Sequence, residues 1–185
     1  MIDKNYYQEW LNAWNYHQEH HMEFHKPVLD NADTIGVNIY GWFGGMFSIG
    51  IVALKFAQAA LLDGLPVNAI HPHIVSPKKY VPPTDLAIEL SRSCSQPVNL
   101  VFVNALETVF FHDDIPSSIR NDKYNIGYWL WELDIIPDSW IPWLQHFDEV
   151  WCASSFIKDS IQKSPGYDGT IIKVLPILQD LSQME

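Results

Sequence analysis

The sequence has few cysteines and few basic residues, and both shortages exclude classes of protein. Cys94 and Cys152 are its only two cysteines, too few for a disulfide framework, so we expect reduced thiols and a cytoplasmic location. Eleven Lys and Arg residues against 22 Asp and Glu residues give a net charge of −11. Such a charge repels nucleic acids and anionic membranes, so we expect neither as a partner.

The sequence also lacks a long uninterrupted hydrophobic run. The longest apolar stretch, residues 46–62, contains Lys55 and Gln58 and is amphipathic, so it predicts no membrane span. The N-terminus continues polar and aromatic after Met1, and we therefore expect no signal peptide. With 48% hydrophobic residues, the 185-residue chain has enough apolar side chains for one domain with a substantial core.

The first thirty residues are predicted to form a peripheral helix. Residues 5–26 are rich in helix-compatible residues, and the aromatic and histidine residues among them recur at intervals of three and four. His17, His21 and His25 fall on one face of such a helix, a spacing also found in metal sites. No cysteine or aspartate accompanies them, so we interpret them as a solvated face and predict no metal site.

From residue 34 onward, strand-like and helix-like segments alternate. The predicted strands are residues 34–40, 66–70, 97–104, 124–131, 148–154 and 170–177. The predicted helices are residues 49–63, which Gly64 should end, a short one at 86–92, and then 105–112, 138–147 and 154–163. This alternation predicts an α/β fold: a doubly wound, mainly parallel, Rossmann-like sheet of about six strands, with the strand at 34–40 central.

A glycine-rich loop follows the first predicted strand. Its glycines, Gly41, Gly44, Gly45 and Gly50, fit neither the dinucleotide-binding fingerprint nor the phosphate-binding loop that ends in G-K-[ST]. Glycine permits close backbone approach, and the helix that begins near Ser48 offers unpaired N–H groups. The loop can therefore hold a phosphate without a lysine, although a tight turn without a ligand would have the same composition.

Polar residues follow other predicted strands, where ligands bind in doubly wound sheets. Asn104 and Glu107 follow the strand at 97–104, and Ser154 ends the strand at 148–154. Trp131 and Glu132 end the strand at 124–131. A carboxylate accepts hydrogen bonds from hydroxyl groups, and indole faces pack on sugar rings, so this pair indicates a polyol site. Aromatic residues that alternate along a strand are more often part of a core.

Taken together, five blocks resemble the first half of a known enzyme family. They read "GVNIYGWFGGMFSIG", "VNLVFVNALE", "YNIGYWLWELDIIPDSW", "DEVWCASSFIKDSI" and "IIKVLPI", in this order. They are similar to bacterial glycosyltransferase family 4-like proteins of the two-domain GT-B fold. With the peripheral helix predicted over residues 1–30, the resemblance implies an acceptor-side Rossmann-like domain over 31–178 and a tail over 179–185, with the second domain absent from this sequence.

The resemblance also implies an activity. Such enzymes transfer a sugar from a nucleotide-sugar to a glycan or other acceptor, usually with retention, and need no cofactor or bound metal. By position, Gly44, Gly45 and Ser48 would lie at the donor diphosphate, and Asn104, Glu107, Trp131, Glu132 and Ser154 would line the acceptor side. The second domain, or a partner chain, would hold the nucleotide-sugar, so we expect the isolated chain to be inactive.

The sequence departs from the family in its glycine loop and leaves two other functions open. Met46 and Ile51 replace two acidic residues that many relatives have there, so acidic contacts from this loop are not expected. The first alternative is a stand-alone binding or regulatory module without catalysis. The second is an unrelated enzyme on a flavodoxin-like sheet that binds a phosphate-bearing cofactor.

Overall fold

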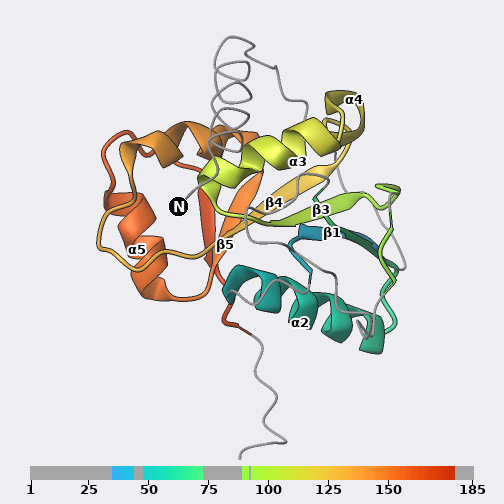
Figure 1. Cartoon of the computed structure of the whole chain (residues 1–185). Helices are drawn as coiled ribbons and strands as arrows, with labels where there is room; N and C mark the ends of the chain where they lie inside the picture. Colours follow the sequence, from blue (N-terminus) through green and yellow to red (C-terminus); the bar gives the residue numbers. More distant parts are fainter. Residues whose placement is uncertain (1–34, 44–47, 73–88, 92, 178–185) are drawn as a thin grey trace, which may run out of the picture.

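Six parallel strands form one sheet, as the sequence predicts (Figure 1). The computed structural model describes residues 35–43, 48–72, 89–91 and 93–177; the predicted N-terminal helix and the tail lie outside these residues. The strands are β1 (Val37–Gly41), β2 (Val67–Ile70), β3 (Val98–Phe102), β4 (Tyr124–Trp129), β5 (Glu149–Cys152) and β6 (Ile171–Val174). Their order across the sheet is β2-β1-β3-β4-β5-β6.

Helices cover the sheet on both faces. They are α2 (Ser48–Leu62), η1 (Ala105–Glu107), α3 (Thr108–Asp114), α4 (Ser117–Arg120), η2 (Asp138–His146) and α5 (Ser155–Lys163). Figure 1 shows α2 on one face of the sheet and α3 on the other. Apolar side chains of α2 pack against one face, and those of α3, η2 and α5 belong to the core cluster on the opposite face. The fold is therefore a doubly wound, Rossmann-like α/β fold.

The helix predicted at residues 86–92 is wrong within its described part. Leu90 instead forms a parallel bridge with Ala69 of β2, and the Ser91 N–H donates to the Ala69 carbonyl oxygen at 2.7 Å. The outer edge of β2 has backbone N–H and C=O groups that need hydrogen-bond partners. An extended segment can pair with them along the strand, and a helix cannot. If the segment at Leu90 is counted as the third strand of the chain, β3, β4 and β5 become the fourth, fifth and sixth strands. The order across the sheet then starts 3-2-1-4-5-6, as in dinucleotide-binding folds.

Two other expectations need correction. β1 is an inner strand between β2 and β3, but β3 and β4 occupy the middle of the sheet, because all later strands add on the β3 side. The helix predicted at 138–147 exists as the 3₁₀ helix η2, which contains Pro142. A proline removes a backbone donor inside a helix, which disfavours a regular α-helix over these residues.

The end of α2 is as predicted. Gly64 has a φ of +79°, a left-handed conformation that glycine adopts without a Cβ penalty. The Leu65 N–H donates to the Ala60 carbonyl at 2.9 Å, and the Gly64 N–H donates to the Leu61 carbonyl at 3.1 Å. These two bonds form a Schellman motif, which turns the chain from α2 into β2.

A ladder of asparagines ties the strands together near their amino ends. Asn68, Asn38, Asn99 and Asn125 lie in register on four neighbouring strands. Asn68 Nδ2 donates to Asn38 Oδ1 at 3.0 Å, Asn38 Nδ2 to Asn99 Oδ1 at 2.8 Å, and Asn99 Nδ2 to Asn125 Oδ1 at 2.8 Å. Because the bonds require this pairing, the ladder fixes the register of the strands whose opposite ends carry the candidate site.

Candidate functional site

The sheet reverses its direction of growth between β1 and β3, and the candidate site lies at their carboxyl ends. From β1 the chain passes to β2 on one side, and it returns to β3 on the other side. Gly41 and Phe102 are opposite each other in the register, so the segments that leave β1 and β3 start side by side. Ligands of doubly wound sheets bind at this kind of reversal.

The start of the glycine loop is anchored on both faces of the sheet. Trp42 is buried in the core on the α3 side, and Phe43 is buried in the core on the α2 side. A Cβ at Gly41 would lie 3.0 Å from the Ala53 Cβ and 3.2 Å from the Phe102 Cβ. Gly41 therefore allows β1, α2 and β3 to approach one another closely.

Of the remaining loop glycines, Gly50 is buried within α2. Gly44 and Gly45 lie outside the described residues. Ser48 is exposed and is the first residue of α2. The first turn of α2 contains no acidic side chain that would oppose an anion. The position predicted for Ser48 at the start of a helix is thus confirmed, and its contact with a diphosphate stays a prediction.

Asn104 and Glu107 are adjacent at the end of β3. The Asn104 N–H donates to Glu107 Oε2 at 3.2 Å, and Asn104 Oδ1 accepts from the Leu130 N–H, beyond β4, at 3.0 Å. Burial raises the pKa of Glu107, and the bond from Asn104 opposes this rise. Asn104 therefore connects the loops that follow β3 and β4, and Glu107 holds the first turn of η1.

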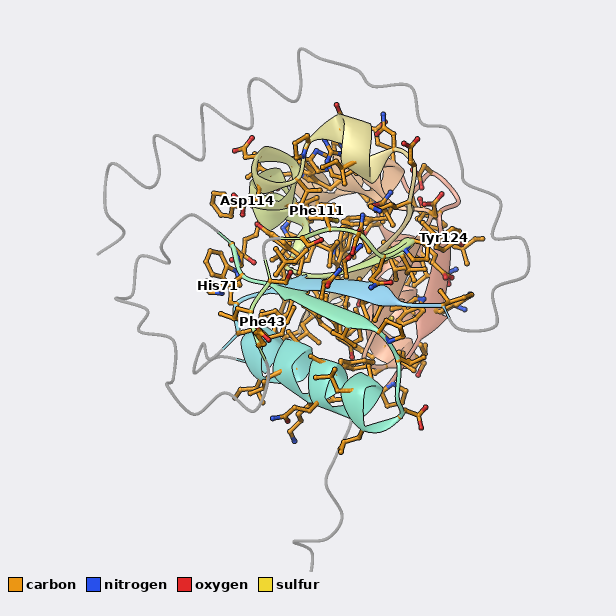
Figure 2. All side chains as sticks on the ribbon, turned by 90° about the vertical axis from the view of Figure 1, so that its right-hand side faces the viewer. Phe43, His71, Phe111, Asp114 and Tyr124 are labelled. Carbon is orange, nitrogen blue, oxygen red and sulfur yellow. The ribbon has the colours of Figure 1, made fainter. Side chains whose placement is uncertain are left out.

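A second polar group lies beside this pair, and the sequence did not predict it. Tyr40 Oη donates to Asp114 Oδ2 at 2.5 Å, joining β1 to the end of α3. His71 directly follows β2, and its Nδ1 is 3.4 Å from the Gly41 carbonyl oxygen. Figure 2 shows Phe43, His71 and Asp114 at one end of the sheet, with Tyr124 at the opposite end. We call Tyr40, His71 and Asp114 the edge triad.

Carboxylates dominate the electrostatics of this region. Burial raises the pKa of Tyr40 well above its usual value, and the charges of Asp114, Asp113 and Glu107 add to this rise. Burial lowers the pKa of His71, while Asp114 opposes that shift. Burial thus favours the neutral form of His71. The phenol, the imidazole and the carboxylates can all exchange hydrogen bonds with hydroxyl groups. The negative charge of the carboxylates disfavours a phosphate in direct contact with them.

Trp131 and Glu132 lie just beyond β4, which ends at Trp129, two residues before the end of the predicted strand. Trp131 is half-buried, its ring centroid lies 4.8 Å from that of Trp140, and its Nε1 donates to the Ile135 carbonyl at 2.9 Å. Glu132 is exposed. Trp129, in contrast, is fully buried in the core, in agreement with the core interpretation of alternating aromatics. Trp131 thus remains a candidate for a saccharide contact, and Trp129 does not.

Ser154 begins α5 at the end of β5. Its Oγ accepts a hydrogen bond from the Ile157 N–H at 3.3 Å and caps the helix. This confirms its predicted position and gives it a structural role. The structure brings Asn104 and Glu107 into direct contact and links Asn104 to the loop of Trp131, whereas the Ser154 side chain hydrogen-bonds within its own helix.

No group of three potential metal-ligating side chains occurs in the part of the chain that the structure describes. The histidines of residues 5–26 lie outside it. Cys94 and Cys152 are both free thiols. Among the described helices, none is both long and apolar enough to cross a lipid bilayer.

Comparisons with known proteins do not assign the chain to a family. No family model, no curated protein and no solved structure matches it.

The edge triad left little signal in the sequence. Tyr40 and Asp114 are 74 residues apart, and Tyr40 lies inside an apolar strand where an aromatic residue predicts only core. His71 had a usable signal, because a titratable residue directly after a buried strand lies at the ligand-binding edge of a doubly wound sheet.

Proposed function

We propose that this chain is the acceptor-binding domain of a retaining glycosyltransferase of the GT-B type. Its substrates would be a nucleotide-sugar donor and a glycan or other hydroxyl-bearing acceptor. A second domain or a partner chain would hold the nucleotide-sugar, and the site would lie between the two parts. Two observations support the proposal: the resemblance of the five sequence blocks, and the reversal of the strand order in the sheet.

The observation that carries the proposal is the reversal between β1 and β3. It places the start of the glycine loop beside Asn104 and Glu107, at the ligand-binding edge of a doubly wound sheet. These are the two segments that the resemblance assigns to the donor diphosphate and to the acceptor.

The chemistry of the described residues favours a neutral polyol on this domain. Carboxylates of Glu107, Glu132 and Asp114 accept hydrogen bonds from hydroxyl groups, and the partly exposed indole of Trp131 offers an apolar surface. The diphosphate would instead need backbone N–H groups of the glycine loop and the amino end of α2. Charge on the departing diphosphate would be stabilised by groups from both sides of the cleft.

Saccharide binding to the chain alone tests the proposal. We would titrate it with neutral oligosaccharides and follow the backbone amide, Trp indole and Asn side-chain signals by NMR. We expect shifts of the Trp131 indole and of the Asn104 side chain, reduced in Glu132→Gln. Asp122→Asn, which removes one exposed carboxylate elsewhere, is the matched control. Saccharides that leave both signals unchanged would contradict the acceptor role.

A transfer assay separates an enzyme domain from a binding module. We expect no sugar transfer by the isolated chain, and transfer when a nucleotide-sugar-binding domain encoded in the same or a neighbouring reading frame is added. In that mixture Gly45→Val should reduce transfer, because a branched side chain would block close backbone approach. Gly64→Ala, at the end of α2, is the control that should affect stability alone. Saccharide binding without transfer in the mixture would identify a binding module.

A further inference from the structure

Three large apolar side chains are exposed on two neighbouring segments, the loop that follows Trp131 and the start of α5. Leu133 is 60% exposed, Ile135 46% and Phe156 50%. Leu133 and Ile135 lie in the loop after β4, and Phe156 is in the first turn of α5. Ser160 Oγ is 2.7 Å from the Leu133 carbonyl oxygen and 3.0 Å from that of Phe156, so the loop and the helix are in contact. We call these three side chains the Leu133 patch.

Buried hydrogen bonds hold the loop in this outward arrangement. Ser160 and Ser164 are both buried; Ser160 Oγ donates to the Leu133 carbonyl, and Ser164 Oγ accepts from the Ile136 N–H at 2.9 Å. Trp131 Nε1 donates a further hydrogen bond to the Ile135 carbonyl. The backbone is thus fixed on both sides of Leu133 and Ile135 while their side chains face solvent. Apolar patches that a fold keeps exposed mark interaction sites.

The border of the patch is acidic. Glu132 and Asp134 flank Leu133 in the chain, and Asp159 lies one turn after Phe156 on α5; all three are exposed. Residues 124–157 contain no Lys or Arg. Lys158 is half-buried, and its charge acts on the Cys152 thiol, at the neighbouring strand end. The chain as a whole carries a charge of −11.

We propose that the Leu133 patch is the docking site for a protein surface that presents apolar side chains between Lys or Arg residues. The apolar centre would supply most of the affinity, and the acidic border would select the sign of the partner's charge and steer its approach. An anionic membrane, which an apolar patch could also bind, is disfavoured by the same border. The docking does not depend on sugar transfer.

The test uses a short amphipathic helical peptide of leucine and lysine, with a leucine–glutamate peptide of the same length beside it. Binding to the full chain is measured by calorimetry, and the surface that it covers is mapped by amide NMR. We expect the lysine peptide to bind and to shift amides of residues 131–136 and of the first turn of α5. The glutamate peptide and vesicles rich in anionic lipid should not bind.

Matched variants separate this patch from general attraction to an acidic protein. Phe156→Ser should weaken binding of the lysine peptide about tenfold, while Leu62→Ser, at a residue of α2 that is 89% exposed, should not. The double variant Asp134→Asn/Asp159→Asn should weaken binding of the lysine peptide severalfold more than the control double variant does. The control, Asp63→Asn/Asp122→Asn, removes the same charge elsewhere on the chain. All six substituted side chains are exposed, so we expect every variant to fold.

The results also distinguish this proposal from the proposed function. Equal losses in the patch and control variants, equal binding of the two peptides, or shifts on another surface would overturn the docking site. None of these outcomes bears on saccharide binding, which is measured in the absence of peptide through Trp131 and Asn104. Loss of saccharide binding would equally leave the peptide result standing.

Discussion

Replacing Asn99 by leucine tests whether the asparagine ladder stabilises the sheet. Asn99 is 1% exposed; it accepts from Asn38 Nδ2 and Cys94 Sγ and donates to Asn125 Oδ1. Leucine has the same branched side-chain shape but removes all three bonds. One amide hydrogen of Asn38 and the side-chain oxygen of Asn125 would then be buried without these partners. Each such group costs about 1–3 kcal/mol, so we expect a loss of about 2–6 kcal/mol.

Urea unfolding followed by circular dichroism measures this loss. It is a large part of the about 5–15 kcal/mol that a domain of this kind has in total, so the midpoint should move clearly. Asn68→Ala is the control, because Asn68 stands at the half-buried end of the ladder, where water can replace its bonds to Asn38 and Ser95. A loss below about 1 kcal/mol for Asn99→Leu, or one no larger than that of the control, would refute the reasoning.

Three further substitutions test other parts of the structure. Gly127→Ala would place a Cβ 3.0–3.2 Å from atoms of the Phe147 ring, and thermal unfolding should show a loss of about 1–3 kcal/mol; an unchanged melting temperature would mean that the ring moves freely. Burial raises the pKa of Tyr128 to about 12, so the folded state favours the neutral phenol. Its contribution to stability is complete below about pH 10 and is lost as the pH rises toward about 12, and Tyr128→Phe should flatten this decline in unfolding experiments. Asn104→Ala removes the acceptor for the Leu130 N–H, and it should cost about 1–3 kcal/mol and weaken saccharide binding in the NMR titration; unchanged values of both would contradict its bridging role.

The strands were predictable because each is a short apolar run next to a turn signal. The prediction of Gly64 as the end of a helix was equally local, since a left-handed residue at that place favours glycine. The structure confirms the parallel, doubly wound sheet and the placement of Asn104, Trp131, Glu132 and Ser154 just beyond their strands.

The features that were missed depend on pairing between distant segments. Leu90 belongs to a sequence compatible with a helix, and only the free edge of β2 makes it extended. The ladder did leave a signal, because an asparagine is the second residue of β1, β2, β3 and β4. A search for apolar runs reads these asparagines as interruptions, although their equal position in each strand predicts that they meet in a parallel sheet.

The charge at the carboxyl ends of β1 and β3 constrains where each substrate of the proposed enzyme would bind. Glu107 and Asp114 both act on Tyr40, so both carboxylates lie near the end of β1. A diphosphate in contact with them would be repelled, whereas sugar hydroxyl groups would find acceptors there. In the proposed enzyme, the donor diphosphate would therefore approach from the α2 side of the reversal, where the first helical turn has no acidic residue. The proposed function thus predicts that the acceptor hydroxyl groups bind on the carboxylate side and the diphosphate at the amino end of α2.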